Sequence, residues 1–521
     1  MMGPIDLDGL SLDSIRAGGL RDRPVTVLGL ARSGLALARF LADAGARVTI
    51  YDGRSAADLA DAIGALGDRP LTLALGPEVE PSLTWAGADL VATSPSITPD
   101  FPTTEPRLRS ALRALVDARA GGDRSAPALV SEADLFLRLC PAPTIGVTGT
   151  KGKTTTASLI AAILAVDPAH PVVLGGNIGI PIVERLFELT PDHRVVDELS
   201  ELQIPTLSRG TTVAVFTNVT ADHLDRHGSL DAYRAVKRRL AELVDRNGVL
   251  VLNADDPVVA SYTELGRART ILYRRDRPRP GGIGVVDGWI VADGVERLAV
   301  GGVGGVAGIA VTGPEGRIMP VEELAMPGAH NVSNALAAIG AGLLFGVDPE
   351  AIRAAISAFT GVEHRLEPVA VIDGVSFIND SQGTQPDAVA AALRAFGPPI
   401  VLIAGGRAKG IDLGALASIV AERAYAAVLI GESGADLEAG FRSAGLVRTE
   451  RAADLETAVR RADAIAREAL AETPAAVGPA TVLLSPAAAS FDMFTDYAAR
   501  GRAFRAAVAA LAAARTEGVD G

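Results

Sequence analysis

The chain has 521 residues, a formal net charge of −13, and 48% hydrophobic against 21% charged residues. This length is too great for one hydrophobic core and the composition is that of an ordinary soluble protein, so we expect about three domains. The acidic balance and the lack of a basic stripe exclude a nucleic-acid partner. Cys140 is the only cysteine, which excludes a disulfide framework. With no long apolar run and no leader pattern, we expect a cytoplasmic protein without a membrane partner.

The first predicted domain, residues 1–127, alternates strand and helix patterns around a glycine turn. This order resembles a dinucleotide-binding fingerprint. However, Ala31 replaces the middle glycine, where the backbone should approach a pyrophosphate, and this argues against an NAD-dependent dehydrogenase. We expect a Rossmann-like unit that binds part of a nucleotide, with Asp52 near a ribose or a uracil. The predicted elements are strand 25–28, turn 29–34, helix 35–44 and strands 47–51 and 90–93.

The second predicted domain, residues 128–361, is organised around a glycine-rich turn between a buried strand, 144–147, and an apolar helical segment, 157–166. The glycines of this turn would direct backbone N–H groups inward, while Lys153 supplies a point charge and Thr154 can hold Mg²⁺. The glycine spacing departs from the common form of the motif. The pattern predicts a nucleotide-phosphate site, and a glycine turn before an ordinary helix is the alternative.

The remaining patterns of the second domain and those of the third, residues 362–521, also alternate strands and helices. Strands that end in polar loops are how open α/β sheets build sites at their carboxyl edge. We therefore expect an α/β fold throughout, with a second doubly wound sheet at the C-terminus. The further predicted elements are strands 172–174, 194–196, 213–216, 400–404, 427–430 and 482–484, helices at 230–244 and from His330, and hairpins within 281–316 and 369–378.

Lysine is rare in this chain. Of 49 basic residues, only Lys151, Lys153, Lys237 and Lys409 are lysines. A chain that otherwise prefers arginine keeps lysine where a compact amine that can lose its proton is needed. Chance placement is the alternative for Lys237 and Lys409, because neither belongs to the phosphate loop.

Taken together, these motifs resemble the Mur ligases, the ATP-dependent enzymes that form amide bonds in peptidoglycan synthesis. The chain looks most like the branch of that family that adds D-glutamate to UDP-N-acetylmuramoyl-L-alanine. The resemblance covers nearly the whole chain. Its carriers are Thr148-Gly-Thr-Lys-Gly-Lys-Thr154, Gly175-Gly-Asn-Ile-Gly179, Glu198-Leu-Ser, Asp222-His-Leu-Asp225, Tyr233-Arg-Ala-Val-Lys237, His330-Asn-Val-Ser-Asn334, His364-Arg365, Asn379-Asp-Ser381 and Leu484-Ser-Pro-Ala-Ala-Ala-Ser490.

The resemblance implies that ATP phosphorylates a carboxylate, after which an amine displaces the phosphate. Charge of this kind is stabilised by metal ions and lysines. The catalytic residues would be Lys153, Glu198, His223 and Lys237, and the ligands of two Mg²⁺ ions would be Thr154, Glu198, His223 and Lys237, with Lys237 carbamylated. The ATP-binding residues would be Gly149, Thr150, Lys151, Gly152, Lys153, Thr154, Thr155, Asn334, Arg365 and Asp380.

For the other substrates, the resemblance places the UDP-sugar near Ser33, Asp52, Ser94 and Asn177. It places D-glutamate near Thr384, Lys409, Ser490 and Tyr497. A cation such as Lys409 suits a carboxylate of a dicarboxylic amino acid. We also expect a monomer whose domains close when the substrates bind.

Four departures from the family pattern leave the amino-acid contacts open: Gln382 where a lysine is usual, Arg407 at a position that is often acidic, Tyr497 for phenylalanine, and Glu201-Leu202 for Ser-Phe. Simpler interpretations also remain for single residues. Glu198 could be a solvated loop carboxylate, His223 a helix cap, and Arg365 a bridge between domains.

Two other classes of function also remain open. A sibling ligase, such as a folylpolyglutamate or a meso-diaminopimelate ligase, could add a different amino acid. The meso-diaminopimelate ligase is disfavoured because no Asp-Asn-Pro-type motif is present in the third domain. A P-loop switch or motor would hydrolyse ATP without either ligase substrate. Phosphate release that requires both substrates would separate these classes.

Overall fold

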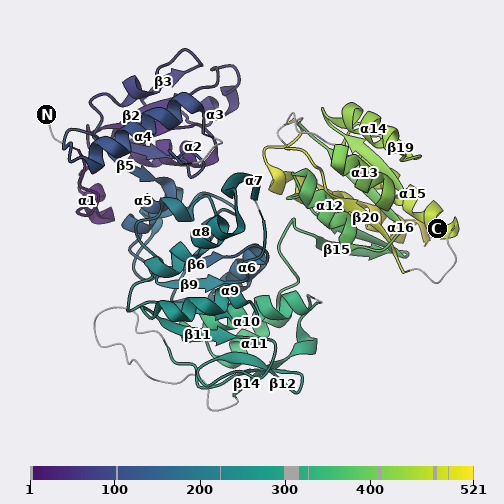
Figure 1. Ribbon diagram of the computed structural model, residues 1–521. Coiled ribbons are helices and arrows are strands. Elements are labelled where there is room, and N and C mark those ends of the chain that lie inside the picture. The colour runs from purple at the N-terminus through teal and green to yellow at the C-terminus, as the bar shows by residue number, and fades with distance from the viewer. Residues whose placement is uncertain are drawn as a thin grey trace. The chain divides into compact units, whose positions relative to one another are not determined.

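The computed structural model describes residues 4–100, 104–222, 224–297, 316–326, 328–407, 414–472, 478–490 and 492–519. The chain divides into two compact units, Met1–Phe359 and Thr360–Gly521. The first unit contains two sheets and the second unit contains one, all in an α/β arrangement, as predicted (Figure 1). None of the described helices is long and apolar enough to cross a membrane.

The first sheet has five parallel strands in the order β3-β2-β1-β4-β5. The strand order reverses between β1 and β4, which is where open α/β sheets bind ligands. The strand β5 extends this sheet beyond residue 127, the predicted end of the first domain; the three domain boundaries themselves remain a prediction. The elements are α1 Leu12–Arg16, β1 Pro24–Leu28, α2 Arg32–Asp43, β2 Arg47–Asp52, α3 Ala60–Gly64, β3 Leu71–Leu75, β4 Leu90–Thr93, α4 Pro106–Ala120 and β5 Ala128–Ser131.

The turn after β1 is shorter than predicted, because α2 begins at Arg32 rather than at Leu35. Gly34 therefore lies inside the first helical turn and not in the loop. A Cβ atom at Gly34 would collide with the carbonyl oxygen of Gly29. Glycine is required here because the helix packs directly against the end of its strand.

The central sheet has nine strands in the order β14-β13-β12-β11-β10-β9-β6-β8-β7. The strands from β7 to β12 are parallel, and β12, β13 and β14 form antiparallel pairs. The predicted hairpin is thus confirmed for β12 and β13, whereas residues 298–315 lie outside the described part. The strands are β6 Thr144–Thr148, β7 Val172–Gly176, β8 Arg194–Glu198, β9 Val213–Phe216, β10 Val249–Asn253, β11 Arg269–Tyr273, β12 Ile283–Val286, β13 Trp289–Ala292 and β14 Gly316–Pro320.

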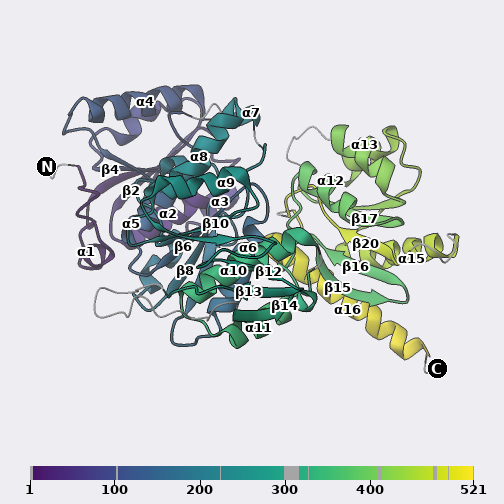
Figure 2. The ribbon, with the colours of Figure 1, turned by 60° about the horizontal axis from the view of Figure 1, so that its bottom comes forward.

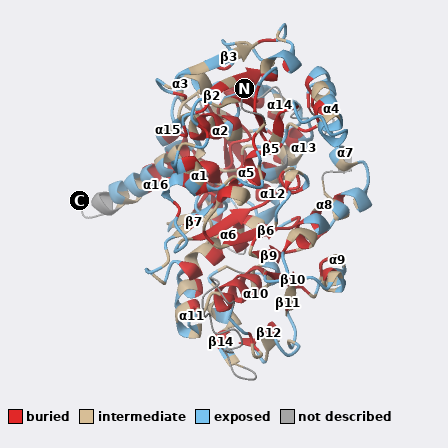
Figure 3. Cartoon of the chain, turned by 90° about the vertical axis from the view of Figure 1, so that its left-hand side faces the viewer, coloured by how far each residue is buried: buried red, intermediate tan, exposed pale blue. Residues whose placement is uncertain are grey.

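Helices cover both faces of the central sheet, and β6 and β9 are buried along their whole length (Figure 3). Such strands are continuous apolar runs because neither face meets water. The helix after the phosphate loop starts at Lys153, earlier than the apolar segment indicated. The helices are α5 Glu132–Leu139, α6 Lys153–Leu164, α7 Leu224–His227, α8 Leu230–Leu243, α9 Pro257–Ala260, α10 Ala329–Leu344 and α11 Pro349–Ala358.

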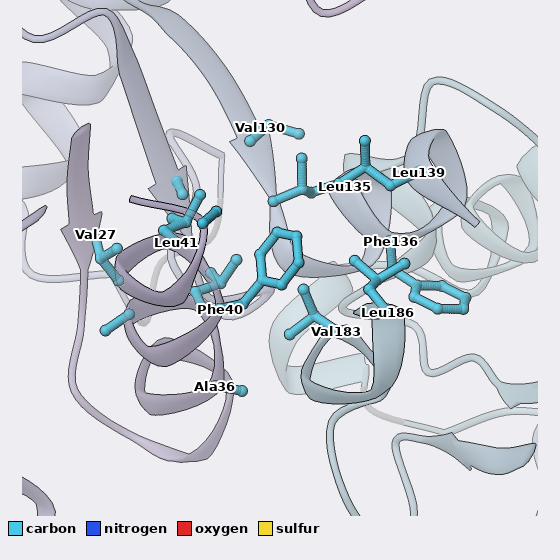
Figure 4. Close-up of a cluster of buried hydrophobic side chains, with 14 of the residues drawn as sticks. Val27, Ala36, Phe40, Leu41, Val130, Leu135, Phe136, Leu139, Val183 and Leu186 are labelled. Carbon is cyan, nitrogen blue, oxygen red and sulfur yellow. The ribbon is translucent and has the colours of Figure 1, made fainter. Parts of the chain in front are cut away.

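One hydrophobic core joins the first sheet to the central part of the chain. Phe40 of α2 packs beside the short helix η2 (Ile182–Glu188), which contributes Val183 and Leu186 and also faces Phe136 of α5 (Figure 4). Burying aromatic and branched side chains of this size stabilises the junction by about 1.5–3 kcal/mol per side chain. The two sheets therefore belong to one compact unit. The structure thus defines the geometry of sites that residues from both sheets line.

The second unit has a six-stranded sheet in the order β15-β16-β20-β17-β18-β19 (Figure 2). Only β15 and β16 are antiparallel, and they form the predicted hairpin around Asp373 and Gly374, both with positive φ. The elements are β15 Glu367–Ile372, β16 Val375–Asn379, α12 Pro386–Ala395, β17 Ile400–Gly405, α13 Gly414–Arg423, β18 Ala426–Ile430, α14 Gly434–Ser443, β19 Thr449–Arg451, α15 Leu455–Glu472, β20 Ala480–Leu484 and α16 Tyr497–Val519.

Candidate active site

The glycine-rich loop connects β6 to α6 and wraps around the N-terminus of that helix. Gly149 and Gly152 have φ values of 153° and 84°, conformations that other residues rarely adopt. The Nζ atom of Lys153 donates to the carbonyl oxygens of Gly149 and Thr150, each at 3.0 Å. No side chain caps α6, so the backbone N–H groups of its first turn face the loop. This geometry suits a phosphate group.

The segment after β9 holds the loop in place. Thr217 Oγ1 donates to the carbonyl oxygen of Lys151 at 2.6 Å. Asn218 exchanges two hydrogen bonds of 2.9 Å with the backbone of Lys151 and accepts a third from Thr150 N. The side chain of Lys151 forms an ion pair of 3.0 Å with Asp222. These contacts fix the conformation of the loop.

The other predicted ATP residues of this unit also lie at the loop. Thr154 is buried and Thr155 half-buried in the first turn of α6. Asn334, from α10, accepts a hydrogen bond from Thr156 Oγ1 at 3.3 Å. A Cβ atom at Gly152 would lie only 2.5 Å from Asn334 Oδ1, so Asn334 packs directly on the loop.

Lys237 is fully buried, although it carries an amine. It lies on α8, and its Nζ atom donates to Thr148 Oγ1 at 3.1 Å, directly before the phosphate loop. The ring of Tyr233 lies 5.6 Å from Nζ. Burial, and then the positive charge of Lys153, lower the pKa of Lys237 to about 7. Three carboxylates act in the opposite direction: Glu201, Glu198 and Asp222.

Glu198 is the last residue of β8 and is only 1% exposed. Its Oε1 atom accepts a hydrogen bond of 3.0 Å from Asn177 Nδ2, and its backbone carbonyl accepts one of 2.8 Å from Asn177 N. Its Oε2 atom is buried and has no hydrogen-bond partner among the described residues. An unpartnered buried carboxylate oxygen costs stability, and a cation would satisfy it.

These donors fit a magnesium site. Mg²⁺ takes oxygen ligands, which Thr154 and Glu198 offer. Within the described ranges, no three His, Cys, Asp or Glu side chains gather in a way that could hold a metal, and His223 lies outside those ranges. The amine of Lys237 is no ligand for Mg²⁺, whereas a carbamate on it would add two oxygens.

The residues expected to hold the UDP-sugar gather at the switch point of the first sheet. Ser33, Ser94 and Asn177 line a pocket of about 160 Å³ between the two sheets of the first unit. Asp52 lines an adjacent pocket of about 520 Å³, and Ser96 lines both. The sequence also predicts that Asp52 contacts a ribose or a uracil.

Asp52 is held by its neighbours. Its Oδ2 atom accepts a 2.8 Å hydrogen bond from Leu30 N and forms an ion pair of 2.8 Å with Arg54. Burial tends to raise the pKa of Asp52, but the hydrogen bonds from Arg54 and Leu30 outweigh it, and the pKa is lowered. Arg54, which also lines the larger pocket, was missed in the sequence.

In the second unit, Asp380 follows β16 in a tight loop. Its Oδ2 atom accepts a hydrogen bond from Ser485 Oγ at 2.6 Å, and its Oδ1 atom accepts one from Leu366 N at 3.2 Å. Burial raises the pKa of Asp380 to about 6, against the hydrogen bonds and the nearby charge of Arg365. The two predicted nucleotide residues of this unit are thus close enough for their charges to interact.

The residues predicted to bind the amino acid come from neighbouring loops. The loops after β16 and β20 are joined by a 2.9 Å hydrogen bond from Ala487 N to Gly383 O. Lys409 lies outside the described residues. The described members of this set are Thr384 (half-buried, after β16), Ser490 (buried, after β20) and Tyr497 (first residue of α16).

Arg500 is a buried arginine beneath these loops that the sequence did not reveal. It is 1% exposed and donates to Ser381 Oγ at 3.0 Å, to Ser381 O at 2.9 Å and to Ala488 O at 3.2 Å. Burial lowers its pKa to about 10, against the opposing charge of Asp492. Arg500 therefore fixes the loops that carry the predicted nucleotide and amino-acid contacts.

Comparisons with known proteins agree with this arrangement. The family description "Mur ligase middle domain" matches residues 147–342, and "Mur ligase, glutamate ligase domain" matches residues 364–487. A UDP-N-acetylmuramoylalanine–D-glutamate ligase from Symbiobacterium thermophilum is 38% identical over 95% of this chain and 100% of its own length. The chain belongs to the Mur ligase family. A second such ligase, from Pelotomaculum thermopropionicum, is 36% identical over 94% of this chain and 98% of its own length.

Among solved structures, the chain is similar to a UDP-N-acetylmuramate–alanine ligase from Thermotoga maritima. The two share 19% identity over 92% of this chain and 98% of that one, with a TM-score of 0.48.

The departures from the Mur ligase pattern have defined surroundings here. Glu201 is buried and lies 3.5 Å from Arg226. The Nε atom of Arg407 lies 3.8 Å from Glu432, and Gln382 is half-buried, with its backbone N–H bonded to His364 O.

Proposed function

We propose that this Mur ligase joins D-glutamate to UDP-N-acetylmuramoyl-L-alanine, with ATP converted to ADP and phosphate, in peptidoglycan synthesis. The observation that carries the proposal is the position of Lys237, a fully buried amine hydrogen-bonded to Thr148 at the start of the phosphate loop. Full-length similarity to UDP-N-acetylmuramoylalanine–D-glutamate ligases supports the choice of substrates.

The reaction needs two transfers. The carboxylate of the L-alanyl group attacks the γ-phosphoryl group of ATP, which gives an acyl phosphate and ADP. The amine of D-glutamate then attacks the acyl carbon, phosphate leaves, and the amine loses a proton as the amide forms. Lys153, with the N–H groups of the loop, stabilises the charge on the transferred phosphoryl group.

Mg²⁺ would neutralise phosphate charge during the first transfer. We propose that two ions bind, held by Thr154, Glu198, His223 and carbamylated Lys237. Carbamylation requires the neutral amine: the Lys237 nitrogen attacks CO₂, a proton leaves, and a carboxylate-like group results. A pKa of about 7 makes the neutral form abundant at physiological pH.

For the other substrates, we propose that Ser33, Asp52, Ser94 and Asn177 bind the UDP-sugar. In the second unit, Arg365 and Asp380 would contact the nucleotide. D-Glutamate would bind near Thr384, Lys409, Ser490 and Tyr497, with a carboxylate of D-glutamate beside Lys409. We further propose a cytoplasmic monomer, which sedimentation equilibrium would test by giving the mass of one chain.

Phosphate release from ATP tests the function directly. We expect release only when UDP-N-acetylmuramoyl-L-alanine and D-glutamate are both present, with each single omission as a control. A panel of L-glutamate, L-lysine, meso-diaminopimelate and D-aspartate would test the amino acid. Release without either substrate would indicate an ATPase, and a clear preference for another amino acid would indicate a sibling ligase.

A further inference from the structure

Arg32, the first residue of α2, has no part in the reaction as proposed so far. Its guanidinium donates to the carbonyl oxygen of Asn177 at 3.1 Å and to that of Gly179 at 3.2 Å. Both carbonyls belong to the loop that follows β7 in the central sheet. The side chain therefore connects the first sheet to the central sheet beside the pocket of Ser33 and Ser94.

This pocket has the character of an anion site. Among the described residues that line it, Arg32 alone has a charged side chain, and the others are small, hydroxyl, amide or apolar. The helix α2 begins there after its N-cap residue, Ala31, whose methyl side chain cannot accept a hydrogen bond. No side chain therefore caps the N–H groups of the first turn. An arginine beside a helix N-terminus suits phosphate oxygens.

The same arginine is linked to the predicted metal ligand. Asn177, whose carbonyl Arg32 holds, donates its backbone N–H to Glu198 O at 2.8 Å and its side chain to Glu198 Oε1 at 3.0 Å. The position of the loop therefore sets which oxygen of Glu198 is left without a hydrogen bond. A guanidinium has five N–H donors, so Arg32 can keep both carbonyls and still bind a phosphate oxygen.

We propose that Arg32 binds the diphosphate of the UDP-sugar and thereby fixes the loop that positions Glu198. This inference rests on the proposed function, because the UDP-sugar supplies the diphosphate. Arg32 is then a binding residue for one substrate and a positioning residue for the site of the other. Occupancy of the UDP pocket should favour binding of Mg²⁺–nucleotide at the phosphate loop.

The first test measures binding of UDP and of uridine by calorimetry, without turnover. Arg32→Met should weaken UDP binding about tenfold or more, the loss expected for charge-assisted hydrogen bonds, and should leave uridine binding unchanged. Arg39→Met is the matched control, because Arg39 also lies on α2 and bonds to Glu184 of the central part, yet lines a different pocket. Equal UDP affinity in wild type and Arg32→Met would overturn the proposal.

The second test measures the coupling between the two sites. In the wild type, saturating UDP should tighten binding of Mg²⁺–ADP about fivefold or more. Arg32→Lys should keep part of the UDP affinity, since it keeps the charge, but lose the coupling, because an ammonium cannot span both carbonyls. Coupling that persists in Arg32→Lys and Arg32→Met would contradict the positioning role.

A structural role alone would lower the thermal midpoint without separating UDP from uridine. Thermal unfolding of each variant therefore accompanies the titrations. If wild-type protein binds UDP and ligates D-glutamate while Arg32→Met binds UDP equally well, only this inference fails. If the wild type does not bind UDP at all, the proposed function fails, and the inference with it.

Discussion

Two junctions in the first unit, β1–α2 and β6–α6, share a strand–turn–helix pattern but differ in the cation that follows the turn. At β6–α6, Lys153 folds back onto the carbonyls of its own loop. At β1–α2, Arg32 reaches away to the carbonyls of another loop. A compact ammonium suits contacts within its own loop, whereas a planar guanidinium suits hydrogen bonds to two carbonyls of a different loop. Under the proposed function, the β6–α6 junction would hold the phosphate that reacts and the β1–α2 junction a phosphate that only binds.

The backbone of the two junctions supports the same distinction. The β6–α6 turn has one more residue between strand and helix, and Gly152 caps its helix with a φ of 84°. The β1–α2 turn is closed tightly by Gly34 against Gly29. The longer turn leaves room for a nucleotide phosphate inside the loop, while the shorter one presents a helix end.

The largest effect is expected at Lys153. Lys153→Ala should reduce ligation about 10²–10³-fold or more, because it removes the charge that stabilises the transferred phosphoryl group. The variant should still fold, since the side chain is only half-buried. Steady-state ligation together with a circular-dichroism melt checks both statements. Turnover close to that of the wild type in a folded variant would contradict the role of the loop.

Lys237 provides the next largest effect. Lys237→Ala should lose about 10²-fold in rate by the removal of a metal ligand, and acetate or formate should restore part of it by filling the vacated space. Lys237→Arg should not be rescued, because the guanidinium occupies the space and stays charged. A rate for Lys237→Ala that does not change with added carboxylate would argue against the carbamate.

The pKa of Lys237 also predicts a dependence of stability on pH. The unfolded chain keeps the lysine proton up to about pH 10.4, whereas the folded chain releases it near pH 7, so stability should rise with pH between these values by about 1 kcal/mol per unit. Lys237→Met lacks this group, so its stability relative to wild type should fall from pH 7 to 8.5 in CO₂-free buffer. Denaturant titrations of both proteins measure the difference.

Lys151→Met is the control for that series. Its side chain is largely exposed and paired with Asp222, so Lys151→Met reports the effect of removing a lysine that folding does not bury. A stability difference for Lys237→Met that does not change with pH would show that the buried amine does not titrate there.

Substitution of Gly34 should mainly affect stability, whereas substitution of Gly152 should mainly affect nucleotide binding. Gly34→Ala forces a collision with Gly29 O and should destabilise the protein by about 1–3 kcal/mol, with little effect on ATP binding in the folded fraction. Gly152→Ala would press on Asn334 at a positive φ and should weaken ATP binding more than stability. Thermal melts and ATP titrations of both variants measure these two effects. A Gly34→Ala variant that loses mainly ATP affinity, or a Gly152→Ala variant that loses mainly stability, would contradict the comparison.

The smallest effect is expected at Asn218, which holds the loop from outside. Asn218→Ala removes the two side-chain hydrogen bonds to Lys151 and should raise the KM for ATP about 3–10-fold, since such bonds contribute about 0.5–1.5 kcal/mol each. The kcat should change less than the KM, because the residue does not contact the transferred group. A fall in kcat alone would place Asn218 in the chemistry.

The sequence predicted most of the architecture, because each buried parallel strand is an apolar run that ends in polar or glycine residues. It misjudged the start of α2, since Gly34 looks like a turn residue and its packing against Gly29 is a tertiary contact. Lys237 could be singled out from the scarcity of lysine and from the resemblance. That it is buried and bonded to Thr148 could not be read from a helix with charged residues on either side.

Arg32 and Arg500 were missed for a related reason. Both are arginines in an arginine-rich chain, so residue type carries little information. Most of their partners are backbone carbonyls, and those of Arg32 and the Ser381 carbonyl bonded by Arg500 lie far away in the chain. No sequence pattern marks a carbonyl that will face a guanidinium. Arg500 also sits near the start of α16, where an exposed cation would look the same.

The transfer of oxygen during turnover tests the central claim most directly. UDP-N-acetylmuramoyl-L-alanine labelled with ¹⁸O in both oxygens of its alanyl carboxylate is turned over with ATP and D-glutamate, and the phosphate is analysed by mass spectrometry. An acyl phosphate requires one ¹⁸O atom in each phosphate released and one retained in the new amide. Phosphate that carries no ¹⁸O, with both labels left in the sugar peptide, would show ATP hydrolysis without ligation and contradict the account.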